Sequence, residues 1–307
     1  MTASPPPADG LFGAADLRAR ASELGVAPSK GRGQNFVVDA NTVRRIVARA
    51  AVRPGERVLE IGPGLGSLTL ALLAAGASVV AVEIDPVLAS ALPATVADRM
   101  PARAADLTVV QADAVTLQPD DLPGPPPVRL VANLPYNVAV PVLLGLLERH
   151  GSLAAGLVMV QAEVGRRLAA PPGSRVYGVP SVKAAWWAQL TVVAPVPRSV
   201  FWPAPNVDSV LVGFTRHEPP GGAGLRARTF VLVDAAFGQR RKMLRAVLSD
   251  SFGSAAAATA ALEVAGLDPA ARGETVDVRG FARLGAVRTG QVPDVPPDLL
   301  RRPGPST

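Results

Sequence analysis

The stretch that decides the fold of this chain is Val58-Leu-Glu-Ile-Gly-Pro-Gly-Leu-Gly-Ser-Leu-Thr69. It opens with a short apolar run, passes through three glycines and continues into a second apolar segment, which is typical of a buried strand, a tight loop and a helix. Glycines let the backbone turn sharply and let a ligand lie against it without a Cβ in the way. The spacing differs from the G-x-G-x-x-G that places a pyrophosphate on a helix N-terminus, so it favours a ligand other than a dinucleotide.

The flanking sequence repeats this alternation of apolar strands and helix-like segments. Strands that alternate with helices of this length predict an α/β fold with a doubly wound, mostly parallel sheet. Residues 190–193 and 207–214 are candidates for the last strands, as an antiparallel hairpin. The other expected strands are 57–61, 78–82, 107–111, 128–132 and 156–160, and the expected helices lie near 67–75, 86–97 and 138–149.

The pattern changes after His217, where Pro219-Pro-Gly-Gly222 interrupts it. Helix-like segments then follow one another, which predicts a small all-helical C-terminal domain over residues 223–290, after a sheet domain over residues 11–217. The Pro- and Gly-rich segments 1–10 and 291–307 are expected to be disordered tails. The expected C-terminal helices are 225–237, 240–250, 254–265 and 278–287.

Two acidic side chains follow neighbouring strands of the predicted sheet. Glu83 ends the second strand and Asp113 follows the third, so both fall at the edge where open α/β sheets bind ligands. An acid at the first position can accept hydrogen bonds from both ribose hydroxyls, and an acid at the second can bind the exocyclic amine of an adenine. Each acid alone could equally cap the following helix. Together with Gly62 and Gly64, they favour an adenosine-type ligand.

The most specific segment is Asn133-Leu134-Pro135-Tyr136, directly after the fourth predicted strand. The side-chain oxygen of Asn133 and the backbone carbonyl of Leu134, held by Pro135, can accept the two hydrogens of a planar amino group and favour a nucleophilic nitrogen. Tyr136 can stack on the nucleobase that carries this amino group. That base has to leave its own stack in the nucleic acid to reach such a pocket. No general base is evident, so catalysis would rest on in-line positioning and electrostatics.

These motifs, with others in the same order, resemble those of the KsgA-type small-subunit ribosomal RNA adenine dimethyltransferases. The resemblance runs from about Lys30 to Leu248 and weakens toward Val287. It implies a Rossmann-like class I methyltransferase fold, S-adenosylmethionine as the methyl donor, and two adjacent adenines in the 3′-terminal hairpin loop of 16S rRNA as the target, each converted to N6,N6-dimethyladenine. The segments that carry it are Gly33-Gln-Asn-Phe-Val-Val-Asp39, Glu60-Ile-Gly-Pro-Gly-Leu-Gly66, Val82-Glu-Ile-Asp85, Gln111-Ala-Asp113, Asn133-Leu-Pro-Tyr-Asn137, Phe201-Trp-Pro-Ala-Pro-Asn-Val-Asp-Ser209 and Phe237-Gly-Gln-Arg-Arg-Lys242.

The resemblance also implies roles for single residues. Asn133 and Tyr136 would hold the target base, and Phe201 would help to close the target pocket, although Phe201 could instead be a hydrophobic plug against the sheet. Val37 stands where leucine is usual, and Trp202 is less typical of the RNA-facing loop. The implied catalytic residues are Asn133, Leu134, Pro135 and Tyr136, and the implied donor-binding residues are Asn35, Val37, Gly62, Gly64, Glu83, Asp113 and Asn133.

The charge of the chain points to a polyanionic partner. Lysine and arginine number 31 against 25 acidic residues, which gives a net charge of +6. Residues 58–150 carry −5, so the remainder carries +11, and this division suits a small-molecule pocket surrounded by a phosphate-binding surface. The densest basic group is expected within two turns of the helix predicted over 240–250, as an RNA-binding face or as a plain solvated face. Its members are Arg240, Arg241, Lys242 and Arg245.

The composition excludes several kinds of site. With no cysteine there is no disulfide, thiol nucleophile or zinc-thiolate site, and two histidines make a metal centre unexpected. No signal peptide is visible, and the long uncharged runs are interrupted by glycine or proline. We therefore expect a cytoplasmic monomer without a membrane or metal requirement. The resemblance described above implies that it binds 16S rRNA in the 30S ribosomal subunit.

Three other functions remain as alternatives. An antibiotic-resistance methyltransferase acting on an adenine of 23S rRNA would share the fold and the donor motifs. A non-catalytic ribosome-assembly or transcription factor could use the same scaffold, but the intact Asn133–Tyr136 segment and Glu83 argue against lost activity. A nicotinamide-dependent dehydrogenase would have no use for the Asn133–Tyr136 segment.

Overall fold

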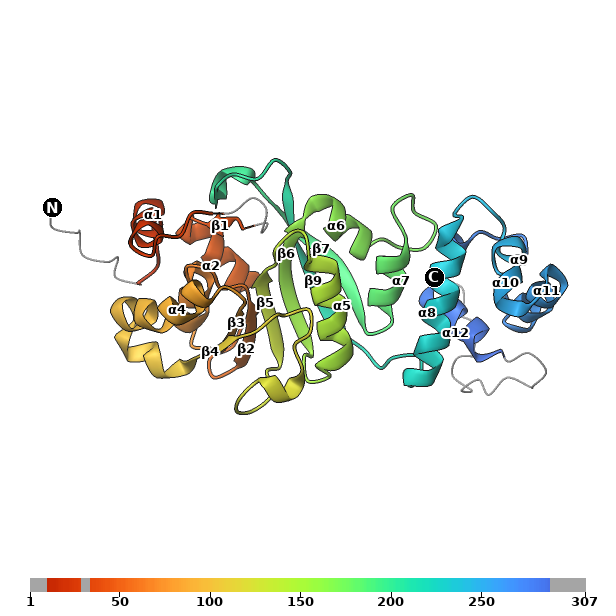
Figure 1. The fold of residues 1–307 in the computed structure, drawn as a ribbon, viewed down its shortest axis with the longest axis horizontal. Coiled ribbons are helices and arrows are strands. Elements are labelled where there is room, and N and C mark those ends of the chain that lie inside the picture. The colour runs from red at the N-terminus through yellow and green to blue at the C-terminus, as the bar shows by residue number, and fades with distance from the viewer. Residues whose placement is uncertain (1–9, 29–33, 288–307) are drawn as a thin grey trace. The chain divides into compact units, whose positions relative to one another are not determined.

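The structure is a computed structural model that describes residues 10–28 and 34–287 (Figure 1). Within these residues the chain forms two compact units, one of residues 10–165 and 190–216 and the other of residues 166–189 and 217–287. The tail predicted over 291–307, and all but Gly10 of the tail predicted over 1–10, lie outside the described residues. Gly10 itself is buried, and its carbonyl accepts a hydrogen bond from Arg99 Nε at 3.2 Å.

The first unit is built on a seven-stranded sheet in the order β4-β3-β2-β5-β6-β9-β7. Strands β4, β3, β2, β5 and β6 run parallel to one another, and β9 is antiparallel to β6. The predicted doubly wound, mostly parallel sheet is therefore confirmed, and the two last strands are neighbours at one edge. The strands are β2 Arg57–Ile61, β3 Ser78–Glu83, β4 Leu107–Gln111, β5 Arg129–Asn133, β6 Ala155–Gln161, β7 Ala188–Val196 and β9 Ser209–Arg216.

Helices join and flank these strands, and polar side chains fix where two of them begin. Asp39 accepts a hydrogen bond from Thr42 N at 2.9 Å, which caps α2. Asp85 accepts from Val87 N at 3.0 Å, and Pro86 occupies the first turn of α4. The helices of this unit are α1 Ala14–Glu23, α2 Ala40–Arg49, α3 Ser67–Ala74, α4 Pro86–Arg99 and α5 Ala139–Arg149, with short 3-10 turns η1 Pro101–Asp106, η2 Pro119–Asp121 and η3 Arg198–Val200. Helix α6 Ala162–Leu168 begins in this unit and ends in the other.

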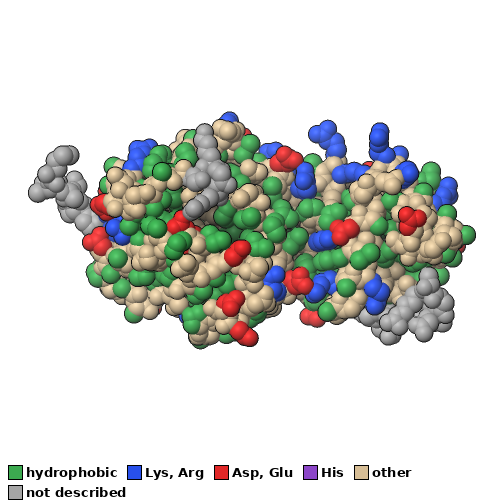
Figure 2. All heavy atoms as spheres, in the orientation of Figure 1, with side chains coloured by type: hydrophobic (Ala, Val, Ile, Leu, Met, Phe, Trp, Pro, Cys, Tyr) green, Lys and Arg blue, Asp and Glu red, His purple; other side chains and the backbone are tan. Residues whose placement is uncertain are grey.

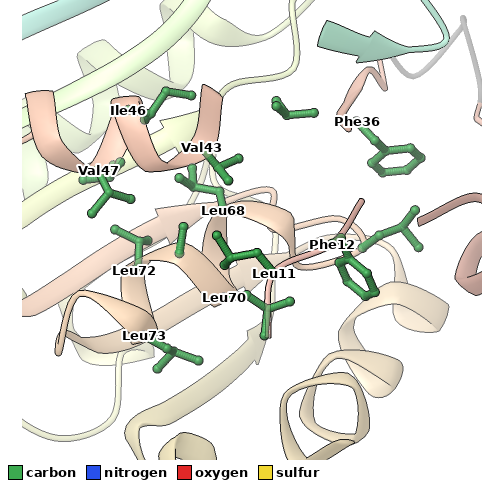
Figure 3. Close-up of a cluster of buried hydrophobic side chains, with 14 of the residues drawn as sticks. Leu11, Phe12, Phe36, Val43, Ile46, Val47, Leu68, Leu70, Leu72 and Leu73 are labelled. Carbon is green, nitrogen blue, oxygen red and sulfur yellow. The ribbon is translucent and has the colours of Figure 1, made fainter. Parts of the chain in front are cut away.

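The core of the first unit lies between the sheet and the helices α1 to α4. Val43 and Ile46 of α2 pack with Leu72 of α3 (Figure 3). They belong to the same cluster as Val58 of β2 and Val79 of β3, which are fully buried. Burial of each such side chain contributes roughly 1.5–3 kcal/mol relative to exposure, so this cluster holds the strand ends in place for the site described below.

The second unit is helical and starts earlier in the chain than the sequence predicts. Residues 166–189, assigned above to the sheet domain, cluster with the C-terminal helices because Tyr177 and Val182 are buried in the same core as Phe281. The Tyr177 hydroxyl also donates to the Val276 carbonyl at 3.1 Å. The elements are α7 Val179–Ala185, α8 Ala223–Gly238, α9 Leu244–Val247, α10 Ser249–Phe252, α11 Ala255–Val264, η4 Gly273–Thr275 and α12 Val278–Ala286.

The prediction of a single helix over residues 240–250 is wrong. Helix α8 ends at Gly238, residues 239–242 form a turn, and two short helices follow. The turn is held from outside the segment, because Leu244 N donates to the Ala271 carbonyl at 2.8 Å. Among the described residues of both units, no helix combines the length and the apolar character needed to cross a membrane.

Candidate active site

A cavity of about 510 Å³ lies at the carboxyl ends of the parallel strands. Residues that follow β2, β3, β4 and β5 line it, which is the edge where open α/β sheets bind ligands. Its volume is in the range of small-molecule sites. The structure brings most of the predicted site residues together around it, namely Asn35, Gly62, Gly64, Glu83, Asp113, Asn133, Leu134, Pro135 and Tyr136.

The glycine loop after β2 forms one wall of the cavity. Gly62, Gly64 and Gly66 have φ angles of +67°, +58° and +94°, so the loop needs left-handed backbone at all three positions. A Cβ on Gly64 would also lie 2.7 Å from Cε1 of Phe36, another residue that lines the cavity. Position 64 therefore requires glycine both for its backbone angle and for the contact with the Phe36 ring.

Glu83, the last residue of β3, is held by the glycine loop. Gly64 N donates to Glu83 Oε2 at 3.1 Å, and Asp85 N donates to Oε1 at 3.0 Å. Burial raises the pKa of this carboxyl above its usual value, and the backbone donors offset part of the rise. These two bonds fix the direction of the carboxylate and leave it further lone pairs for hydroxyl donors, as a ribose contact requires.

Asp113 makes a local turn contact and also lines the cavity, and no helix begins directly after it. Its Oδ1 accepts a hydrogen bond from Val115 N at 2.9 Å, which is the local turn contact expected of a capping residue. The same residue lines the cavity between Ala112 and Ala114. The local bond orients the carboxylate at the cavity wall, so the turn contact and ligand binding are compatible at this position.

Asn133, the last residue of β5, carries an unused hydrogen-bond acceptor. Its Nδ2 donates to the Asn35 carbonyl at 2.8 Å, which fixes the orientation of the amide. Its Oδ1 is buried and has no hydrogen-bond partner among the described residues. An unsatisfied buried acceptor costs about 1–3 kcal/mol, so it requires an explanation, and use by a ligand or a reaction is one such explanation.

Tyr136 is half-buried, and its hydroxyl shares a hydrogen bond with the Ser209 hydroxyl at 2.5 Å. Burial raises the pKa of the Tyr136 phenol above its usual value, so the phenol stays protonated near neutral pH. The ring is therefore available as a flat apolar surface at the cavity, and the neutral hydroxyl is not suited to act as a base.

Two predicted contacts do not reach the cavity. Val37 and Phe201 face each other as partners of the small antiparallel sheet formed by β1 Phe36–Val37 and β8 Phe201–Trp202. Both side chains are buried in the core of the first unit, and neither lines the cavity. Phe201 therefore corresponds to the hydrophobic plug of the two alternatives, and Phe36, the neighbour of Val37, is the residue that contacts the glycine loop.

Several lining residues were missed by sequence reasoning. Gln34 and Phe36 flank the predicted Asn35, and Ile84 and Asp85 follow the predicted Glu83. Ile84 is 63% exposed, which is unusual for a large apolar side chain beside an acidic site. Its position directly after the strand-ending acid is the signal that could have marked it as an apolar contact for a ligand.

Glu60 lies in β2 beneath the site and is almost fully buried. Its Oε2 accepts a hydrogen bond from the Thr69 hydroxyl at 2.7 Å. Burial is the main cause that raises the pKa of the Glu60 carboxyl to about 8, and the nearby Glu83 adds to the rise. The carboxyl is therefore protonated at neutral pH and does not add a second negative charge beside Glu83.

The predicted basic group of the helical unit does not form one helical face. Arg240 lies in the turn after α8, where its Nε contacts Glu274 Oε2 at 2.5 Å and its Nη2 donates to the Ser174 carbonyl at 3.2 Å. Arg241, Lys242 and Arg245 are exposed. Figure 2 shows lysine and arginine side chains gathered over this part of the helical unit. Arg240 is thus tied into the fold, and the other three are available to a partner.

No group of three or more potential metal-ligating side chains occurs among residues 10–28 and 34–287.

Comparisons with known proteins agree with the geometry of the cavity. Residues 29–282 match the family described as "Ribosomal RNA adenine dimethylase". A protein of Streptomyces avermitilis named "Ribosomal RNA small subunit methyltransferase A" is 60% identical over 92% of this chain and 95% of its own length. A protein of Leifsonia xyli with the same name is 61% identical over 90% of this chain and 98% of its own length.

Solved structures give the same result for the fold. The 23S rRNA methyltransferase ErmE is 28% identical, with a TM-score of 0.60, over 82% of this chain and 98% of its own. A dimethyladenosine transferase from Plasmodium falciparum is 22% identical, with a TM-score of 0.65, over 80% of this chain and 94% of its own. The Rossmann-like class I methyltransferase fold expected from the sequence is confirmed, and the chain belongs to the ribosomal RNA adenine dimethylase family.

Proposed function

We propose that this protein transfers methyl groups from S-adenosylmethionine to N6 of two adjacent adenines in the 3′-terminal hairpin loop of 16S rRNA, within the 30S ribosomal particle. The names of its relatives at about 60% identity support the small-subunit target. The observation that carries the proposal is the buried, unpartnered Asn133 Oδ1 at the wall of a cavity that also holds Glu83 and Asp113. An acceptor at that place is what a target amino group requires.

The residues around the cavity fit the donor. Gly62 and Gly64 turn the loop backbone at the cavity wall with φ angles of +67° and +58°, and they present no side chain to the donor. Glu83, already oriented by two backbone N–H groups, would accept hydrogen bonds from the ribose hydroxyls, and Asp113 would bind the adenine amine. When bound, S-adenosylmethionine supplies a methyl group on a positively charged sulfur, which needs a nucleophile but no metal.

The segment after β5 would receive the target base. Asn133 Oδ1 and the Leu134 carbonyl would accept the two N6 hydrogens, which localises the nitrogen lone pair for attack. Tyr136 would stack on the adenine, a contact worth about 1–3 kcal/mol in nucleic-acid complexes. Because Tyr136 is neutral and Glu83 is held by backbone donors, neither is placed as a base, and the proton would leave to water after transfer.

The exposed cations of the helical unit would bind rRNA phosphates. Arg241, Lys242 and Arg245 are exposed and near one another in the chain, as expected for a surface that reads the RNA backbone rather than its sequence. Arg240 was predicted to take part, and its contacts with Glu274 and Ser174 assign it instead to holding the turn. We propose a monomer that works in the cytoplasm, because its substrate, the 30S particle, is there.

Methylation of an adenine in 23S rRNA is the second candidate, because the ErmE structure matches 98% of its own length to this chain. The deciding experiment gives purified protein and labelled S-adenosylmethionine to 30S particles and to 23S rRNA, both prepared without the modification, and maps the methylated adenines. We expect label on two adjacent adenines of 16S rRNA and none after Asn133→Ala. Label on 23S rRNA instead, or transfer unaffected by Asn133→Ala, would contradict the proposal.

A further inference from the structure

Ser209 is the hydrogen-bond partner of Tyr136 and lies 73 residues further along the chain. It is the first residue of β9, where it pairs with Gln161, the last residue of β6. Its side chain is fully buried, and it is followed by the apolar residues Val210 and Leu211 in the same strand. The Ser209 hydroxyl thus lies at the start of an apolar strand, and its side-chain hydrogen-bond partner among the described residues is the Tyr136 phenol at the cavity.

The backbone around Ser209 is fixed on both sides. Ala162 N donates to the carbonyl of the preceding residue, Asp208, at 2.8 Å. The Asp208 carboxylate forms an ion pair with Arg198 at 2.9 Å, and Arg198 also donates to the Asn206 carbonyl at 3.1 Å. The Ser209 hydroxyl is therefore presented from a strand end whose backbone is hydrogen-bonded to the neighbouring segment.

The hydroxyl pair restrains the ring of Tyr136 in one particular way. The phenol oxygen lies on the axis about which the ring rotates, so a hydrogen bond to it fixes where that axis points and not the rotation about it. Without the bond, the half-buried ring could swing about χ1 to another staggered position. A base-stacking surface has to be held within about 0.5 Å and 10–20° of its working position, and side chains of this kind depend on supporting residues for that precision.

We propose that Ser209 is a positioning residue for the target base, which holds Tyr136 where an adenine stacks on it. This role rests on the proposed function, in which Tyr136 contacts the target. It predicts that loss of the Ser209 hydroxyl weakens use of the RNA substrate and leaves donor binding unchanged, because the Ser209 side chain is not part of the cavity lining.

The test compares Ser209→Ala, Tyr136→Phe and the double variant of the full chain. Steady-state kcat and KM are measured on 30S particles that lack the modification, and the S-adenosylmethionine Kd is measured by calorimetry. A hydrogen bond of ordinary strength corresponds to about a threefold to tenfold loss of kcat/KM in each single variant. The double variant is expected to lose no more than the worse single variant, with the donor Kd within about twofold of wild type.

Ser181→Ala is the matched control. Ser181 is also a buried serine, but it lies in the helical unit, where its hydroxyl donates to the Arg167 carbonyl and accepts from Gly178 N at 3.1 Å. We expect this variant to lower the melting temperature and to keep the wild-type kcat/KM. If Ser209→Ala fails to fold, Tyr136→Phe alone still has to show the same kinetic loss with an unchanged donor Kd.

Several outcomes would overturn the role of Ser209. These are a Ser209→Ala variant with wild-type kcat/KM, losses that multiply in the double variant, or a weakened donor Kd that accounts for the whole effect. Failure of the proposed function looks different, because the wild-type protein itself would then not methylate 30S particles, and the positioning role would be overturned with it.

Discussion

The side-chain amide of Asn133 donates to the backbone carbonyl of Asn35 at 2.8 Å, across 98 residues of sequence. This bond determines which end of the amide is left as an acceptor, since only Oδ1 remains without a partner. The segment before α2 therefore orients the Asn133 amide through its backbone, and the chemistry of Asn35's own side chain is not needed for that effect.

Asn133→Asp is expected to reduce methyl transfer although it preserves the shape of the side chain. The variant replaces the Nδ2 donor with an oxygen that faces the Asn35 carbonyl, so that two acceptors oppose each other. Leaving a buried acceptor unpaired costs about 1–3 kcal/mol, which corresponds to a loss of roughly fivefold to 150-fold in kcat/KM. The measurement is labelled methyl transfer to 30S particles, beside calorimetric donor binding. Wild-type kcat/KM in the Asn133→Asp variant would show that amide orientation is unimportant.

Gly64→Ala is expected to abolish tight donor binding. The new Cβ meets Phe36 Cε1 at 2.7 Å, and the left-handed φ of +58° costs about 1–2 kcal/mol more in any residue with a side chain. Gly55→Ala is the matched control, because Gly55 has a φ of +78° and open space around its Cβ position. Both variants should lower the melting temperature, and only Gly64→Ala should raise the S-adenosylmethionine Kd. Equal Kd values in the two variants would remove Phe36 and Gly64 from the donor site.

Arg240→Ala is expected to affect the stability of the fold, and Arg241→Ala is expected to affect binding to the 30S particle. Arg240 bonds Glu274 and the Ser174 carbonyl, so its loss should lower the melting temperature by about 2–4 °C, as a change of about 1 kcal/mol does in a chain of this size. Arg241 is exposed, so its loss should leave the melting temperature unchanged, weaken 30S binding and reduce the salt dependence of binding by about one unit of slope. A larger effect of Arg240→Ala than of Arg241→Ala on the salt slope would reverse these two roles.

These predictions also mark which parts of the site were visible in the sequence. The strand ends, the glycine loop and the acids after β3 and β4 were predictable, because they depend on local patterns and on the rule that parallel strands end at one edge. The Asn133–Tyr136 segment was recognisable because its residues follow directly after such an edge. Long-range contacts were not visible in this way.

The errors share that cause. The turn at residues 239–242 replaces a predicted helix because Arg240 reaches Glu274, 34 residues later, which periodicity cannot show. Residues 166–189 join the helical unit because the Tyr177 hydroxyl finds the Val276 carbonyl, 99 residues away. Phe201 lies in the core and not in the expected pocket because β8 pairs with β1, and no local sequence pattern connects these two segments.

The buried carboxyl of Glu60 makes a prediction about pH. Its pKa is raised from 4.5 to about 8 in the folded protein, so between these values the folded state holds a proton that the unfolded state has lost. The free energy of unfolding therefore falls as pH rises through this window, by up to about 1.4 kcal/mol per pH unit from this group. Glu60→Gln keeps an acceptor for Thr69 and removes the titration, so its melting temperature should depend less on pH between 5 and 8.

Glu56→Gln provides a contrast, because the pKa of Glu56 is lowered in the folded protein whereas that of Glu60 is raised. Arg129 holds the pKa of Glu56 below its usual value through a hydrogen-bonded ion pair at 2.8 Å, so the stability from this pair is fully present above pH 4.5 and is lost only at lower pH. Its removal should lower the melting temperature by a similar amount at every pH between 5 and 8, without changing the slope. Glu60→Gln should change the slope of melting temperature against pH, and Glu56→Gln should shift the whole curve. Thermal denaturation at four or five pH values therefore distinguishes the effects of the two carboxyls. A Glu60→Gln curve parallel to that of the wild type would mean that Glu60 is ionised in the folded protein and that a second negative charge lies beneath the donor site.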